Sequence, residues 1–388
     1  MAAMKRFTMT SLAVCALTVP LAAQEPAGGF EGYPVLKAGE LLKPEVLKGP
    51  HHEVLESVPT KGFANQYTVQ TTWGVFTIHG NELLAKRIHE FDAIARLEEA
   101  SKSEEFKRSL GAAAAKPFKM IGGALQDPGE TVRGIGAGAG RFFRKAGEAI
   151  DRGGKKSANT DSSVKSLVGF SKAKRAIAAE LRVDPYTDNA ILQHRLDDMA
   201  KATFAGGFVV QAGTFALSAG ADVGAATVAG VASITSDVAN LIRDNSPVAL
   251  SALNREKLLG LGVDAAVASA FVEHPNVTPY QQTMITFYLA RLGRVEGIGD
   301  FLTMMHPSED PADVEFFVRT AELMSVYHEK VSPVKRVLNL YGLPAIHAEN
   351  GVLVNPLAID YGSWTSEADR LSKALMDYKA EVEITKKL

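Results

Sequence analysis

The nine histidines are the side chains of this sequence best suited to acid–base or metal chemistry. They stand at positions 51, 52, 79, 89, 194, 274, 306, 328 and 347. No pair has the H-x-x-x-H spacing that places two ligands on one helix face, and His328-Glu329 lacks the second histidine of an H-E-x-x-H motif. The His51-His52 pair has no further ligand at metal-binding spacing. The sequence therefore predicts no metal site and no cofactor.

Three other motifs match a chemical pattern only loosely. Gly134 to Ala139 reads G-x-G-x-x-A, but a dinucleotide site needs a preceding strand, and none is predicted there. Ser218 lies in a degenerate nucleophile elbow without the strand-to-helix turn that such an elbow requires. Asp184 and Asp188 lack the glycine and the distal glutamate of a calcium loop. We therefore predict no catalytic residue.

The N-terminus has the features of a secretory signal peptide. Lys5 and Arg6 precede an uncharged run that ends in Leu-Ala-Ala, which predicts cleavage after Ala23. A lipoprotein signal at Cys15 is the alternative, but Val14 stands where acylation favours a small residue. Cys15 is the only cysteine, so the mature chain would have no disulfide and no thiol chemistry. We expect an exported protein of the periplasm or cell envelope.

Charge is unevenly distributed along the chain. The formal net charge is −2, but residues 112–182 carry +8 (14 basic, 6 acidic) and residues 183–388 carry −9 (16 basic, 25 acidic). The basic stretch can contact an anionic membrane surface or an acidic protein partner, or it can face the chain's own acidic C-terminal part. No nucleic acid is expected, because aromatic and basic residues do not interleave.

The stretch 118–150 combines an apolar stripe, basic residues and eight glycines. The apolar residues recur at helical spacing, but each glycine disfavours a helix by about 0.5–1 kcal/mol relative to alanine. The alternatives are therefore a surface-active or interface helix and a glycine-rich loop. A basic amphipathic helix can lie in a membrane surface. The residues predicted to contact a membrane or partner are Phe118, Ile121, Leu125, Arg133, Ile135, Arg141, Phe142, Arg144 and Lys145.

A second unusual stretch, 202–236, has Asp222 as its only charged residue. It consists mostly of Ala, Gly, Ser, Thr and Val, whose transfer from water into a membrane is only weakly favourable. It is interpreted either as two closely packed helices in a protein core or as a membrane-inserting hairpin.

The remaining patterns predict a mainly α protein, a bundle-like body of many helices with minor β structure. β-forming residues predict a hairpin over 65–78, and Asn350-Gly351 between apolar runs predicts another over 345–354. We hypothesise that the two hairpins form one small antiparallel sheet. Apolar spacing and helix-start signals predict helices over 81–101 (with Asn81 as N-cap), 166–181, from 190, after Thr278-Pro279, after Asp310-Pro311 and over 367–383.

The predicted domain organisation has five parts along the chain. They are a signal peptide at 1–23, an extended or poorly ordered lead-in at 24–60, a hairpin-and-helix domain at 61–150, a linker at 151–163 and a C-terminal helical domain at 164–388. The linker is predicted from its lack of apolar residues. In the helix over 81–101, Arg87 and Glu90 are predicted to lie outside the apolar face.

These features predict an exported, non-catalytic envelope protein that associates with a membrane surface or a protein partner through 118–150. One alternative is a periplasmic hydrolase with a site assembled from distant residues. A pocket that combines an acidic group with two or more of His79, His89, His328 and His347 would favour it. The other alternative is a pore-forming helical protein that inserts 202–236.

Overall fold

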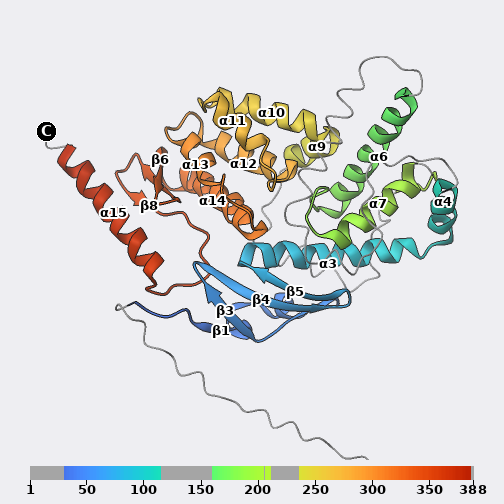
Figure 1. Cartoon of the computed structure of the whole chain (residues 1–388), viewed down its shortest axis with the longest axis horizontal. Helices are drawn as coiled ribbons and strands as arrows, with labels where there is room; N and C mark the ends of the chain where they lie inside the picture. Colours follow the sequence, from blue (N-terminus) through green and yellow to red (C-terminus); the bar gives the residue numbers. More distant parts are fainter. Residues whose placement is uncertain (1–29, 115–159, 205, 211–235, 386–388) are drawn as a thin grey trace, which may run out of the picture.

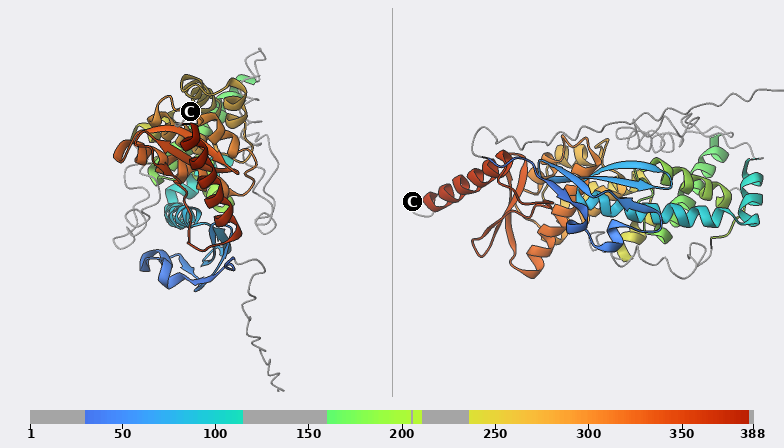
Figure 2. Two further views of the ribbon diagram at one scale, coloured as in Figure 1. Left: turned by 90° about the vertical axis from the view of Figure 1, so that its left-hand side faces the viewer. Right: turned by 90° about the horizontal axis from the view of Figure 1, so that it is seen from below.

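A computed structural model of the chain describes residues 30–114, 160–204, 206–210 and 236–385. These residues are mainly α-helical and include two small antiparallel sheets, which confirms the predicted fold class. Figure 1 shows helix α3 between the five-stranded sheet and the other helices, and Figure 2 shows the same body from two further sides. The described helices include none that is both long and apolar enough to cross a membrane.

The first apolar core is formed by the five-stranded sheet and six helices. Its elements are β1 (Val35–Lys37), α1 (Ala38–Leu41), α2 (Pro44–Leu47), β2 (His52–Val54), β3 (Ser57–Lys61), β4 (Ala64–Thr71), β5 (Gly74–His79), α3 (Asn81–Ser101), α4 (Glu104–Ala114), α6 (Thr160–Leu181) and α7 (Ala190–Phe204). Strand β4 is central and pairs with β2, β3 and β5. Because side chains alternate along a strand, Tyr67 and Val69 point into this core, where Phe91 of α3 is also buried.

The second core is formed by the C-terminal helices and the three-stranded sheet. Its elements are α9 (Ser236–Asp244), α10 (Pro247–Gly260), α11 (Ala265–Val272), α12 (Pro279–Leu292), α13 (Ile298–Met304), α14 (Pro311–Lys330), β6 (Val334–Leu340), β7 (Leu343–Ala348) and β8 (Leu353–Val354), with α15 (Ser366–Thr385) beside the sheet. Thr278 caps α12 in a complete capping box, and Asp310 caps α14. Both predicted helix starts are confirmed.

The hypothesis that the two hairpins form one sheet is wrong. The hairpin β4–β5 belongs to the five-stranded sheet, and β7–β8 belongs to a separate sheet with β6. The reason is that each hairpin buries its apolar face in a different core: Val69 lies in the first and Ile346 in the second. The Asn350-Gly351 turn itself is present, with Gly351 at φ 81°.

Two of the predicted segments contain regular structure. Residues 35–61 form three strands and two short helices, where the sequence predicted an extended or poorly ordered lead-in over 24–60, and Val58 is fully buried. Helix α6 begins at Thr160, so the last four residues of the predicted linker are helical; the rest of that linker lies outside the described residues. Helices α6 and α7 bury Ile177 and Leu196 in the first core, together with the N-terminal sheet.

A C-terminal segment caps the helix on which the candidate site is built. The N-cap of α3 is Gly80, which has no side chain, and Asn81 is the first helical residue rather than the cap. The Asp360 carboxylate accepts hydrogen bonds from the backbone N–H groups of Asn65 at 2.8 Å and Asn81 at 3.1 Å. Residues distant in sequence thus fix the first turn of α3, which carries Glu82.

Candidate functional site

Helix α3 carries charged residues on a face that is buried rather than exposed. Arg87 retains 8% of its accessible surface and Glu90 only 1%, so the prediction that both lie outside the apolar face is wrong. Leu83 and Ile94, each four residues from one of these two, share their side of α3 and are buried as well. A helix enclosed on most sides has no solvent-facing stripe for its polar residues.

Arg87 joins α3 to the turn that precedes α7. Its guanidinium donates to Glu90 at 2.6 Å and to Asp188 at 2.5 Å. Glu90 also accepts a hydrogen bond from the Asn189 amide at 3.0 Å and one from the Thr187 hydroxyl. Every charge in this group is paired, as burial requires.

Lys86 joins α3 to α14. Its ammonium donates to Glu315 Oε1 at 2.6 Å, and the same oxygen accepts from the Gln281 amide of α12 at 2.7 Å. Thr278, next to Gln281 on the N-terminal turn of α12, donates its hydroxyl hydrogen to Asp184 at 2.8 Å. Four separate parts of the chain therefore meet at one polar layer between the two cores.

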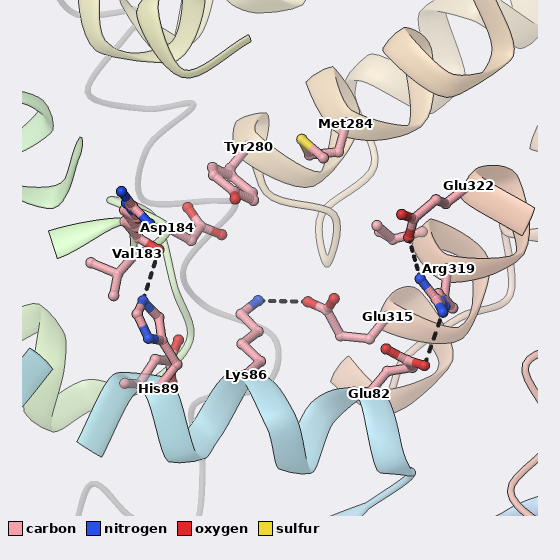
Figure 3. Close-up of a pocket in the computed structure, with 13 residues that line it drawn as sticks. Glu82, Lys86, His89, Val183, Asp184, Tyr280, Met284, Glu315, Arg319 and Glu322 are labelled. Carbon is pink, nitrogen blue, oxygen red and sulfur yellow. Dashed lines mark hydrogen bonds and ion pairs between the residues drawn. The ribbon is translucent and has the colours of Figure 1, made fainter. Parts of the chain in front are cut away.

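Arg319 of α14 completes the layer. Its guanidinium donates to Glu322 at 2.7 Å and lies 3.4 Å from Glu82 in the first turn of α3. Figure 3 shows these three side chains on one side of the cavity, and Lys86, Asp184 and Tyr280 on the other.

The layer borders a partly open cavity of about 70 Å³. The residues that line it are Glu82, Lys86, His89, Glu90, Arg182, Val183, Asp184, Tyr280, Met284, Glu315, Val318, Arg319 and Glu322. A water molecule needs about 10–15 Å³ of such space, so the cavity has room for a few waters or for one small molecule.

Burial shifts the proton affinities of the carboxyl groups around this cavity. Burial raises the pKa of Glu82 to about 7, against the opposing effect of Arg319, and it raises the pKa of Asp184 to about 6, against that of Lys86. For Asp188 burial acts in the same direction, but the charges of Arg87 and Lys86 outweigh it and lower the pKa to about 2. Titratable groups with displaced pKa values in a cavity mark a candidate functional site.

This chemistry suits proton or ligand binding better than covalent catalysis. A carboxyl group with a pKa near 7, such as Glu82, can exchange a proton at neutral pH. The Thr278 hydroxyl that contacts Asp184 is buried and caps α12, so its role is structural. In the described ranges no group of three or more His, Cys, Asp or Glu side chains is arranged to hold a metal ion.

The histidines that would have favoured a hydrolase do not share a pocket. His89 alone lines the cavity, and its Nε2 lies 3.0 Å from the Leu181 carbonyl oxygen. His79 pairs with Asp310, His328 accepts from the backbone N–H of Val334, and His347 packs against Tyr378.

The residues predicted to contact a membrane or partner, Phe118 to Lys145, all lie outside the described residues. The signal peptide and most of 202–236 lie outside them too. The cavity was not predicted from the sequence. The available signal was the charged set at positions 82, 86, 87 and 90, whose spacing of three and four places it along one side of a helix.

Replacing Glu82 by glutamine is expected to flatten the pH dependence of stability. The folded-state pKa is raised from 4.5 to about 7, so the stability contributed by the protonated acid is complete below about pH 4.5 and is lost as pH rises through 7. At about 1.36 kcal/mol per pKa unit, the advantage of Glu82→Gln over the wild type should grow by up to about 3 kcal/mol between pH 4 and pH 8. Urea unfolding at several pH values measures this difference in the free energy of unfolding between the variant and the wild type. The exposed Glu349→Gln variant is the control, and parallel curves for both variants would contradict the expectation.

No protein-family model matches the chain, and the searches of curated proteins and of solved structures find no match either.

Proposed function

We propose that this chain is an exported, non-catalytic protein of the cell envelope that associates with an anionic membrane surface through its basic, glycine-rich segment 118–150. An acidic protein partner is the alternative ligand for the same segment. In this account the described helices form a scaffold that carries the segment.

The proposal is supported by the positions of the helices that flank the two stretches 118–150 and 202–236. The basic stretch follows α4 and precedes α6, and the uncharged stretch follows α7 and precedes α9. Helix α7 packs against α4 and α6, and α6 packs against α9. These four helices lie in the half of the body opposite α15 (Figure 1). The four helices that flank the two stretches therefore belong to one packed group.

Side-chain packing fixes these flanks relative to one another. The rings of Phe106 in α4 and Phe208 after α7 meet edge to face, with centroids 5.6 Å apart. A Cβ atom on Gly206 would lie 2.0 Å from the backbone oxygen of Ser109, so only glycine allows the chain to pass there. The residues that follow α7 therefore pack closely against the first half of α4.

Charge supports the membrane over other surfaces. A basic residue near an anionic lipid surface contributes about 1 kcal/mol of attraction, which falls off within a Debye length. Residues 112–182 carry a net charge of +8, of which the segment 118–150 contributes +2 (5 basic, 3 acidic). Together with apolar residues at helical spacing, such a charge density favours binding to lipid headgroups.

Flotation of the mature chain, from Gln24, with lipid vesicles tests the proposal. The protein should float with vesicles rich in anionic lipid at low salt, float much less at 0.5 M salt, and stay at the bottom with neutral vesicles. Absence from the anionic vesicle fraction at low salt would exclude membrane association and leave the acidic protein partner as the ligand to seek.

A further inference from the structure

Strand β5 forms an open edge of the five-stranded sheet. It pairs with β4 in a continuous register, and on its other side it pairs with no described strand. The N–H of Gly80, which follows β5, donates to the Asn65 carbonyl on the β4 side at 2.8 Å. Because successive residues of an antiparallel strand direct their backbone groups to alternate sides, Val75, Thr77 and His79 direct theirs away from β4. In the described part of the chain these N–H and C=O groups make no hydrogen bond.

Strand β5 also lacks the features with which natural proteins protect an edge strand. Such strands carry lysine, proline or a bulge, or a further segment covers them. Strand β6 has two of these features: the exposed Lys335, and the Glu296 carbonyl, which accepts from the Val337 N–H at 2.8 Å. The only titratable side chain of β5 is His79, and its ring is already paired with Asp310 at 3.3 Å. An unprotected edge of six residues indicates a strand that pairs with a further chain.

The side chains of β5 leave apolar surface beside the free backbone groups. Val75 is 61% exposed, and Phe76 is only partly buried. Thr77 is exposed as well. The sheet is an outer layer of the body, with α3 between it and α12 and α14 (Figure 1). The edge of β5 therefore combines free hydrogen-bonding groups with exposed apolar side chains.

We propose that β5 is the surface at which two copies of this chain pair, antiparallel, to join their sheets into one. A two-fold axis at Thr77 places this residue opposite itself and Val75 opposite His79 of the second copy. Because the three outward-facing residues are symmetric about Thr77, every free N–H then meets a free carbonyl oxygen. On the other face of the strand, Phe76 lies opposite Ile78 of the second copy, which is a favourable apolar pair.

The charges around β5 favour this antiparallel arrangement. Lys61 and Asp313 lie near His79 at one end of the strand. At the other end, the turn at Thr72 and Trp73 is uncharged. Antiparallel pairing places the charged end of each copy beside the uncharged turn of the other, so that like charges do not meet. A second copy therefore supplies complementary hydrogen bonds, apolar pairs and charge at once.

Sedimentation velocity of the mature chain over a range of concentrations, without lipid, tests the proposal. We expect a dimer that dissociates on dilution. Thr77→Lys and Thr77→Glu each set two like charges opposite each other at the axis, so each variant alone should be monomeric where the wild type is dimeric. An equimolar mixture of the two variants should form a dimer again, because lysine then faces glutamate. Gln70→Lys, at an exposed position of β4, is the control and should dimerise like the wild type.

A proline variant gives a second readout. The Thr77 N–H points away from β4, so Thr77→Pro removes no hydrogen bond within the sheet but blocks the edge. This variant should also be monomeric. Recovery of the dimer in the mixture of lysine and glutamate variants shows that those two variants are folded.

Three results would overturn the proposal. One is a wild type that stays monomeric at every concentration, which would leave an extended peptide of another protein as the partner of β5. The others are a dimer of Thr77→Lys or Thr77→Pro as stable as that of the wild type, and a mixture of the charged variants that stays monomeric. Because lipid is absent, the outcome is independent of the proposed membrane association.

Discussion

Replacing Arg87 by methionine is expected to lower the free energy of unfolding by about 3–5 kcal/mol, because it leaves buried charges without their partner. The Arg87 side chain is 10% exposed, and the Glu90 side chain that it pairs with is 2% exposed. Methionine keeps most of the length and apolar volume of the arginine, so the loss reports on charge rather than on a cavity. Urea denaturation followed by circular dichroism measures it.

Two further variants separate the ionic cause from a packing defect. Adding Glu90→Gln and Asp188→Asn to Arg87→Met removes the unpaired charges and should recover most of the lost stability, since a buried ion group replaced as a whole is often nearly neutral. The control is Arg243→Met, which breaks the exposed ion pair with Asp244 and should change stability by less than about 1 kcal/mol. A loss in the triple variant as large as in Arg87→Met would contradict the ionic explanation.

The second large effect is expected on vesicle binding when the basic face of 118–150 is neutralised. The variant changes Arg133, Arg141, Arg144 and Lys145 to glutamine. At about 1 kcal/mol per basic residue near an anionic surface, the four changes should weaken binding by about 4 kcal/mol, or roughly a thousandfold. Titration of the protein with anionic vesicles at low salt measures the affinity.

A matched control removes the same charge from the other half of the scaffold. It changes the exposed lysines Lys330, Lys335, Lys373 and Lys379 to glutamine. If binding depends on the position of the charges, this control keeps its affinity within a few-fold of the wild type. Equal losses in the two variants would mean that only the net charge matters, and would contradict a dedicated binding segment.

Local signals predicted the elements whose ends are set by neighbouring residues. Thr278-Pro279 and Asp310-Pro311 begin helices because the capping side chain and the proline act within one turn, and Asn350-Gly351 forms a turn because Gly351 tolerates a positive φ. Strand β6 was not predicted. It carries the exposed Lys335 and Arg336, and its turn places Tyr341, a non-glycine residue, at φ 54°.

The candidate site could not be predicted because nothing local marks it. Its residues come from α3, from the turn before α7, from α12 and from α14, which are separated by about a hundred residues or more except for the last two. Arg87 and Glu90 have the spacing of an ordinary exposed ion pair, and only the packing of α3 between the two cores buries them. Likewise, Asp360 caps α3 from 279 positions away from Asn81.

Hydrogen–deuterium exchange of the mature chain, with and without anionic vesicles, tests the proposed function most directly because it locates the contact. The account predicts that vesicles slow exchange over 118–150 and leave the buried helices α3, α12 and α14 unchanged. Bound protein that shows unchanged exchange over 118–150, or slower exchange only elsewhere, would contradict it.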